Sequence, residues 1–139
     1  MKLVRRLAIS AGTAVALFLT SAGAVAAAAT IPFQIDPAPY GNPNGSFDAP
    51  SVRCVAEVGN QPGTMTITGG KAGRWGCLLS AEVRWMNLST GASGVTQLSD
   101  GLNGIPAAAV HTGTGQVAVA VLSLAGGVIT PGAATFWVP

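Results

Sequence analysis

The chain has 139 residues, of which 49% are hydrophobic and only 9% charged, and its formal net charge is +2. Three of its seven basic residues lie among the first six positions, so the remainder carries four basic against five acidic residues. This balance argues against nucleic-acid binding by phosphate neutralisation and against attraction to anionic membranes, because both need a basic cluster.

The N-terminal segment has the order of a cleavable signal peptide. Basic residues precede an uncharged apolar stretch from Leu7 to Leu19, and the small residues after it end in Ala24-Val25-Ala26. This order predicts a signal peptide over residues 1–26, with cleavage after Ala26 and with Ala28 or Ala29 as alternatives. The alternative of a retained membrane anchor is disfavoured because the Leu-rich part is shorter than the roughly 20 residues that a span needs. We therefore expect a protein that is secreted or held in the cell wall, with no stable membrane span after cleavage.

The next segment, residues 27–50, is rich in proline. It carries five of the nine prolines of the chain, at positions 32, 37, 39, 43 and 50. Because proline lacks an amide donor and fixes φ, the segment is expected to be an extended arm with at most one edge strand near Ile31–Ile35. Residues 51–139 then form the folded domain.

The two cysteines of the chain, Cys54 and Cys77, are expected to form a disulfide. Export leads into an oxidising compartment, and only one intramolecular pairing is available. A crosslink over this separation stabilises a fold by about 3 kcal/mol in the chain-entropy model. The spacing is not that of a zinc site.

Period-two alternation of apolar and polar residues predicts short β-strands throughout the rest of the chain. The clearest run places Cys77, Leu79, Ala81, Val83 and Trp85 on one apolar face. The expected strands cover residues 54–58, 64–68, 77–85, 94–99, 117–122, 128–130 and 135–138.

Two further segments have distinctive patterns. Residues 117–122 are apolar on both faces, which predicts a central strand that is covered on both sides. Residues 107–110 could form a helical turn rather than a strand.

About seven short strands with regularly spaced turns, and no convincing amphipathic helix, predict an all-β domain. The expected fold is a single antiparallel β-sandwich or small barrel.

The sequence offers little for catalysis. His111 is the only histidine, and the chain has no G-x-S-x-G elbow and no phosphate-binding lysine motif. Glu57 and Glu82 are interpreted as cross-strand partners of Arg53 or Arg84 rather than as a glycosidase pair. No catalytic residue, metal site or cofactor is therefore expected.

Two short motifs concern modification and binding. Asn87-Leu88-Ser89 matches a glycosylation sequon and is interpreted as a chance match. Trp85 shares the face of Val83 and is expected in the core. Trp75, beside a glycine-rich turn, and Trp137, out of phase with its neighbours, are candidates for exposure and for contact with a sugar ring or a partner protein.

Several features together resemble a known group of proteins. They are the Ala-rich leader, the pair Cys54 and Cys77, Trp85-Met86-Asn87 with Thr90-Gly91, and the ending from Pro131-Gly132 to Phe136-Trp137. In these features the chain resembles small Ala- and Gly-rich exported proteins of high-GC Gram-positive bacteria with immunoglobulin-like folds. The resemblance implies an immunoglobulin-like β-sandwich and carries no functional residue to this chain.

The preferred hypothesis is a non-enzymatic β-sandwich of the secreted or cell-envelope class that binds an unidentified protein or polysaccharide through loops or a sheet face. One alternative is an inhibitor of an extracellular hydrolase, and another is a carbohydrate-binding module that uses Trp75 or Trp137. A third is an envelope β-barrel subunit. An enzyme would require His111 to lie within hydrogen-bond reach of a carboxylate and a nucleophile.

Overall fold

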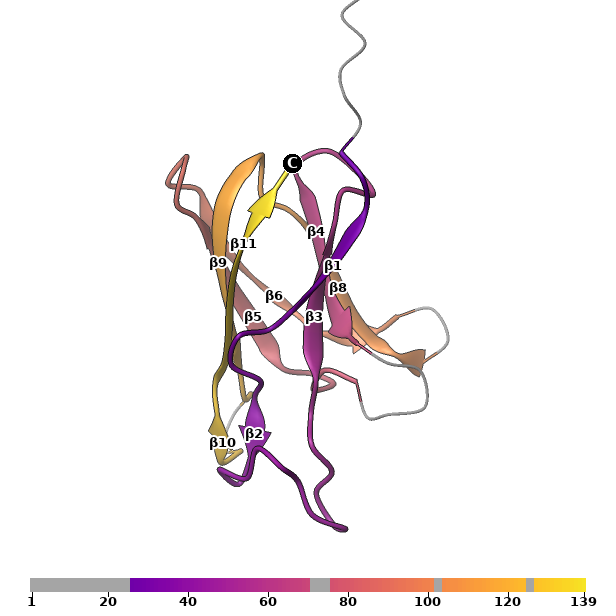
Figure 1. Cartoon of the computed structure of the whole chain (residues 1–139). Helices are drawn as coiled ribbons and strands as arrows, with labels where there is room; N and C mark the ends of the chain where they lie inside the picture. Colours follow the sequence, from indigo (N-terminus) through magenta and orange to yellow (C-terminus); the bar gives the residue numbers. More distant parts are fainter. Residues whose placement is uncertain (1–25, 71–75, 102–103, 125–126) are drawn as a thin grey trace, which may run out of the picture.

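A computed structural model describes residues 26–70, 76–101, 104–124 and 127–139 (Figure 1). The expected signal segment before Ala26, and Trp75, lie outside the described residues. Within these ranges the protein is all-β with antiparallel sheets, as predicted. No helix in the described part of the chain is long and apolar enough to cross a membrane.

The first sheet has five strands in the order β1-β3-β4-β8-β7. Their bounds are β1 Ala29–Pro32, β3 Cys54–Val58, β4 Thr64–Gly69, β7 Ser99–Asp100 and β8 Pro106–His111. A second sheet has four strands in the order β11-β9-β5-β6. Their bounds are β5 Glu82–Asn87, β6 Ser93–Gln97, β9 Gly115–Leu122 and β11 Gly132–Val138. The short strands β2 (Ala38–Pro39) and β10 (Ile129–Thr130) pair with each other below them.

The hydrophobic core lies between the two larger sheets, which face each other in Figure 1. The five-stranded sheet contributes Ala56, Met65 and Ile67, and the four-stranded sheet contributes Val83 and Val117; all five are fully buried. Alternate residues of β3, β4 and β9 point into this core, as the period-two pattern requires. Apolar alternation in the sequence therefore places the core correctly.

The disulfide between Cys54 and Cys77 is confirmed, with a Cα–Cα distance of 4.6 Å. The expected strand over residues 77–85, however, begins only at Glu82. Ser80 adopts a positive φ of 60°, and Leu79 is exposed rather than part of an apolar face. The amide of Ser80 donates to the carbonyl of Leu98, which holds this turn in place. Cys77 is buried in the loop before β5, and not in a strand.

The possibility of a helical turn at residues 107–110 is wrong. These residues lie within β8, which pairs with β4 on one side and with β7 on the other. Pairing with β4 covers all of residues 107–110, whereas β7 reaches only Ala107, so β4 takes up most of the backbone groups that would otherwise have bonded locally. Tertiary pairing therefore decides the conformation of a short Ala-rich segment whose own preference is for helix.

The proline-rich segment contacts both large sheets. Its β1 pairs with β3, and Ile35 exchanges backbone hydrogen bonds of 3.0 and 2.7 Å with Ala133 of β11. The side chain of Gln34 also bonds the backbone amide and carbonyl of Thr135. Residues 34 and 35 therefore cover the outer edge of β11.

Candidate functional site

Strand β9 lies in the middle of its sheet, as predicted, but only one of its faces is covered. Val117, Val119 and Val121 are at most 4% exposed and point into the core. Their neighbours Ala118 and Ala120 point to the opposite side and are half-buried. Neither of the described sheets lies over this second face (Figure 1). The expectation that β9 is covered on both sides is thus wrong, and an apolar surface is left open.

We call this surface the outer face of the four-stranded sheet. It consists of the alternate residues that point away from the core. They are Ala133, Thr135 and Trp137 of β11, Gln116, Ala118, Ala120 and Leu122 of β9, Glu82, Arg84 and Met86 of β5, and Ser93, Val95 and Gln97 of β6.

Three large apolar side chains of the outer face are exposed to solvent. The exposed fractions are 57% for Trp137, 48% for Met86 and 61% for Val95. Trp137 lies opposite Gln116 in the register of β11 with β9. Of the two tryptophans that the sequence singles out, Trp137 thus lies on an open sheet face, whereas Trp75 falls outside the described residues.

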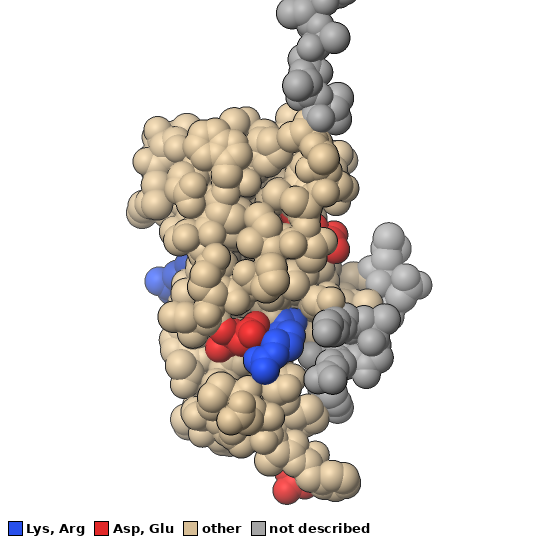
Figure 2. Space-filling view, viewed as in Figure 1, with Lys and Arg blue, Asp and Glu red and all other residues tan. Residues whose placement is uncertain are grey.

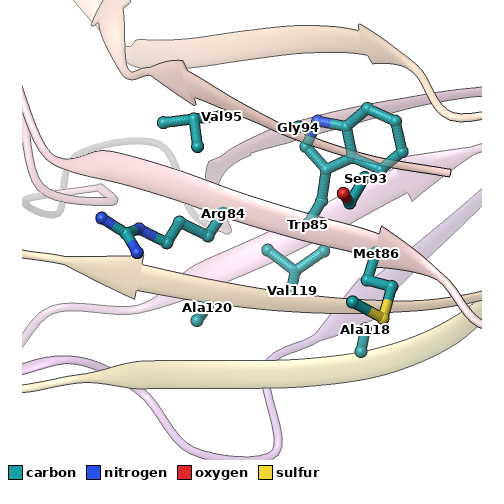
Figure 3. Close-up of a pocket in the computed structure, with 9 residues that line it drawn as sticks. All are labelled: Arg84, Trp85, Met86, Ser93, Gly94, Val95, Ala118, Val119 and Ala120. Carbon is teal, nitrogen blue, oxygen red and sulfur yellow. The ribbon is translucent and has the colours of Figure 1, made fainter.

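A shallow groove of about 400 Å³ crosses the middle of the outer face (Figure 3). Its side chains come from β5, β6 and β9, and they are Arg84, Met86, Ser93, Val95, Ala118 and Ala120. Ala118 and Ala120 have small side chains, whereas Arg84 and Met86 beside them are long. The methyl groups of the two alanines therefore form the floor of the groove, and the longer side chains of β5 form one of its sides.

Trp85 supports this floor from the core side. A Cβ added to Gly94 would lie 2.9 Å from three atoms of the indole, so the ring fits directly against the bare backbone of Gly94. Figure 3 shows the ring beside Gly94. Trp85 is half-buried and packs against the core, which agrees with its expected place.

Sequence reasoning missed Met86 and Val95 as surface residues. Once Trp85 is assigned to the core, strict alternation along β5 places Met86 on the opposite face. Val95 follows in the same way from its pairing with Arg84. The period-two alternation of the sequence therefore predicts that these residues point outward. It does not show that the face to which they belong is left open.

Charge on the outer face is confined to one ion pair. Arg84 bonds Glu82 within β5, and not across strands as expected. The expectation that Glu57 pairs with Arg53 or Arg84 is also wrong, because Arg53 contacts Asp36 at 3.1 Å and Arg84 contacts Glu82. Among the described residues these are the two ion pairs, and the side of the molecule shown in Figure 2 is mostly uncharged.

The residues available for catalysis do not converge in the described part of the chain. His111 is exposed, and its Nδ1 lies 3.3 Å from the hydroxyl of Thr64. Among the described residues, no hydrogen bond joins His111 to a carboxylate. Within the same residues, no group of three or more His, Cys, Asp or Glu side chains could hold a metal ion. The outer face, with its exposed apolar side chains and its groove of about 400 Å³, is taken as the candidate site.

The sequon residue Asn87 has a structural role. Its side chain is fully buried. Nδ2 donates to the carbonyls of Thr112, Gly113 and Thr114 at 3.0 to 3.3 Å, and Oδ1 accepts from the amides of Ser89 and Thr90. An oligosaccharide could not be attached without breaking these bonds, so the motif serves as a link between two loops.

A second group of exposed apolar residues lies in loops near β2 and β10. Phe47 is fully exposed, and Tyr40 donates its amide to the carbonyl of Val128 at 2.8 Å. Tyr40 and Val128 are also exposed. These residues belong to irregular loops, whereas the residues of the outer face are held in register by three strand pairings.

Comparison with protein-family models, with curated proteins and with solved structures finds no match to this chain.

Proposed function

We propose that the protein is an exported, non-enzymatic, immunoglobulin-like β-sandwich that binds a protein partner through the outer face of its four-stranded sheet. The uncovered second face of β9 is the observation that carries this proposal. A strand that is apolar on both sides is ordinarily covered on both sides. Here the missing cover is supplied by the partner.

Export is supported by the disulfide, because such bonds persist mainly in oxidising compartments. Cleavage after Ala26 is supported by the packing of the next residues. A Cβ added to Gly59 would lie 2.5 Å from the carbonyl oxygen of Ala27, so the chain runs directly over this glycine. Cleavage after Ala28 or Ala29 would remove that contact.

The immunoglobulin-like assignment is supported by the order of the strands. In such domains strands A-B-E-D form one sheet, and G-F-C, extended by C′, form the other. The orders β3-β4-β8-β7 and β11-β9-β5-β6 correspond to these two sheets, with β1 as an additional strand. Trp85 then lies on strand C, where such domains carry a buried tryptophan. The disulfide differs, since it joins the start of β3 to the loop before β5.

A protein is favoured over a polysaccharide by the chemistry of the face. Tryptophan and methionine are enriched where proteins bind one another, and contiguous apolar surface on a monomer commonly marks such a site. A site for a sugar ring needs polar groups that lie around the edge of the ring and form hydrogen bonds with its hydroxyls. The groove offers a methyl floor, Met86 and Val95, and its charged group Arg84 is already paired with Glu82.

The test uses the full chain, expressed with its own leader, exported and processed by the host. Mass spectrometry reads its N-terminus, and cleavage after Ala26 is expected. The wild type, Trp137→Ser, Met86→Ser and the control Phe47→Ser are immobilised and exposed to envelope and supernatant proteins of the source organism. The same four proteins are incubated with insoluble polysaccharides.

We expect one protein to bind the wild type and the Phe47→Ser control in fixed stoichiometry. Trp137→Ser and Met86→Ser should weaken its binding at least about tenfold, the scale of a typical hot-spot truncation. Binding that is insensitive to both substitutions on the outer face would contradict the proposal. Retention on a polysaccharide that depends on Trp137 would replace it with carbohydrate binding.

A further inference from the structure

Strand β6 is the open edge of the four-stranded sheet. It pairs with β5 on one side, and no described strand pairs with it on the other. The opposite edge, β11, is covered by residues 34 and 35. The two edges of the same sheet therefore differ: residues 34 and 35 bond the backbone of Ala133 and Thr135 on β11, whereas no described residue bonds the open side of β6.

Hydrogen bonds at the two ends of β6 show which groups these are. The amide of Asn87 donates to the carbonyl of Ala92, and the amide of Leu98 donates to the carbonyl of Ala81. In an antiparallel pair, bonded and non-bonded positions alternate. Gly94 and Thr96 therefore turn their amides and carbonyls toward β5. The groups of Ser93, Val95 and Gln97 point to the open side.

The other sheet edges are protected by means that natural proteins commonly use, and β6 has none of them. Short edge strands, prolines and charged side chains all discourage pairing with another chain. Strand β7 has only two residues, and β1 ends in Pro32. Strand β6 has the sequence Ser-Gly-Val-Thr-Gln, with no proline and no charge, and Val95 at its centre is 61% exposed.

We propose that the protein forms a symmetric homodimer in which β6 pairs antiparallel with β6 of a second copy. With Val95 on the two-fold axis, Val95 lies opposite Val95, and Ser93 lies opposite Gln97 in both directions. All outward amides and carbonyls of the strand then pair, giving about six intermolecular backbone hydrogen bonds. A second copy fits because the strand is uncharged and because this register uses the same residues on both sides, as an isologous contact requires.

The dimer has a consequence for the outer face. Ser93, Val95 and Gln97 belong both to the edge and to that face, so pairing of the edges joins the two outer faces into one continuous surface. The two grooves then lie on the same side of an eight-stranded sheet, and a partner protein would meet two of them. The proposal does not depend on such a partner, because the unpaired groups of β6 are its basis.

The decisive variant is Val95→Pro. Proline removes the amide of residue 95, which points away from β5, so the pairing within the molecule is retained. Proline is tolerated on an edge strand in this orientation. The preceding residue, Gly94, is in the extended conformation that proline favours. Val95→Lys is a second variant that keeps every backbone group but places two like charges opposite each other at the axis. Thr135→Lys is the matched control, with the same charge on the same face but on β11.

Sedimentation velocity of the exported, processed protein measures the outcome from about 1 µM to about 1 mM, a range that covers weak and moderate dimers. The wild type and Thr135→Lys should form a dimer in a concentration-dependent manner. Val95→Pro and Val95→Lys should remain monomeric at concentrations at least about tenfold higher, a shift of about 1.4 kcal/mol. Circular dichroism and thermal unfolding confirm that both variants are folded, and Val95→Lys decides if Val95→Pro does not fold.

A wild type that is monomeric over the whole range would overturn the proposal. It would also be overturned by a dimer that persists in the folded Val95→Lys variant, or by open-ended polymers, which an isologous contact does not produce. Trp137→Ser should leave the dimer intact. The proposed partner binding and the proposed dimer can therefore fail separately.

Discussion

Asn87 is the buried polar side chain on which the loops at one end of the four-stranded sheet depend. Replacing it with alanine leaves the carbonyls of Thr112 and Thr114 without their donor and the amides of Ser89 and Thr90 without their acceptor. We expect Asn87→Ala to lower the free energy of unfolding by about 2 to 4 kcal/mol, because several buried groups lose their partner together. Urea unfolding followed by fluorescence measures this change.

The control for that substitution is Asn60→Ala, since Asn60 is exposed and lies in a turn. It should change the free energy of unfolding by less than about 0.5 kcal/mol. Equal effects of the two substitutions would show that the bonds of Asn87 contribute nothing specific.

Gly94 and Trp85 form a second close contact between single residues. Because an added Cβ at position 94 would lie 2.9 Å from the indole, Gly94→Ala must displace the ring. We expect a loss of about 1 kcal/mol in the free energy of unfolding, at the low end for overpacking because the half-buried ring can shift. A change in tryptophan fluorescence should accompany it.

A double-mutant cycle with Trp85→Leu identifies the cause of this loss. Gly94→Ala should cost clearly less in the Trp85→Leu background, because the smaller side chain leaves room for the methyl group. If the cost were the same in both backgrounds, the indole would not be responsible.

Among the structural elements, β3 and the loop before β5 are joined by the disulfide. Cys54 begins β3 of the five-stranded sheet, and Cys77 lies 23 residues later, just before the four-stranded sheet. The bond thus links the segments that lead into the two layers. We expect the Cys54→Ala, Cys77→Ala double variant to lose about 3 kcal/mol, since the unfolded chain regains the freedom of the closed loop.

Urea unfolding of the oxidised wild type and of the double variant tests this value. A difference below about 1 kcal/mol would mean that residual structure in the unfolded chain already supplies the constraint. Reduced wild-type protein should behave like the double variant, which separates the effect of the crosslink from that of the side chains.

Elements whose own pattern is regular could be predicted from the sequence, whereas elements defined by their neighbours could not. Alternation correctly placed β3, β4 and β9. The start of β5 was misplaced because the turn at Ser80 is held by Leu98, a residue whose proximity no local pattern reveals. Strand β8 was not recognised because its Ala-rich run becomes a strand only through pairing with β4.

The candidate site was predictable in part. Trp137 was singled out by its phase relative to Phe136, and the structure finds it exposed. The apolar character of both faces of β9 was also visible. Which of the two faces stays open depends on the positions of the two sheets, and residues 117–122 alone contain no information on that.

At the scale of the whole molecule, the two edges of the four-stranded sheet differ in whether another described segment of the chain covers them. The N-terminal segment pairs with β3 and then crosses to β11, so it protects one edge and ties the two sheets together. Nothing in the described part of the chain does the same for β6. Asymmetric protection of this kind restricts edge-to-edge pairing to one strand, and a closed dimer rather than a fibre is the geometric result.

The low charge of the molecule makes a further prediction about this dimer. Strand β6 carries no charged side chain, and the nearest described charges, Glu82 and Arg84, already pair with each other. Ionic screening acts on unpaired surface charges, so it has little to weaken at this contact. We expect the dimer dissociation constant to change by less than about twofold between roughly 50 mM and 500 mM sodium chloride, in contrast to charge-steered complexes. Sedimentation equilibrium at the two salt concentrations measures it. A dimer that is more than about tenfold weaker in high salt would indicate that ion pairs rather than the backbone of β6 hold the two molecules together.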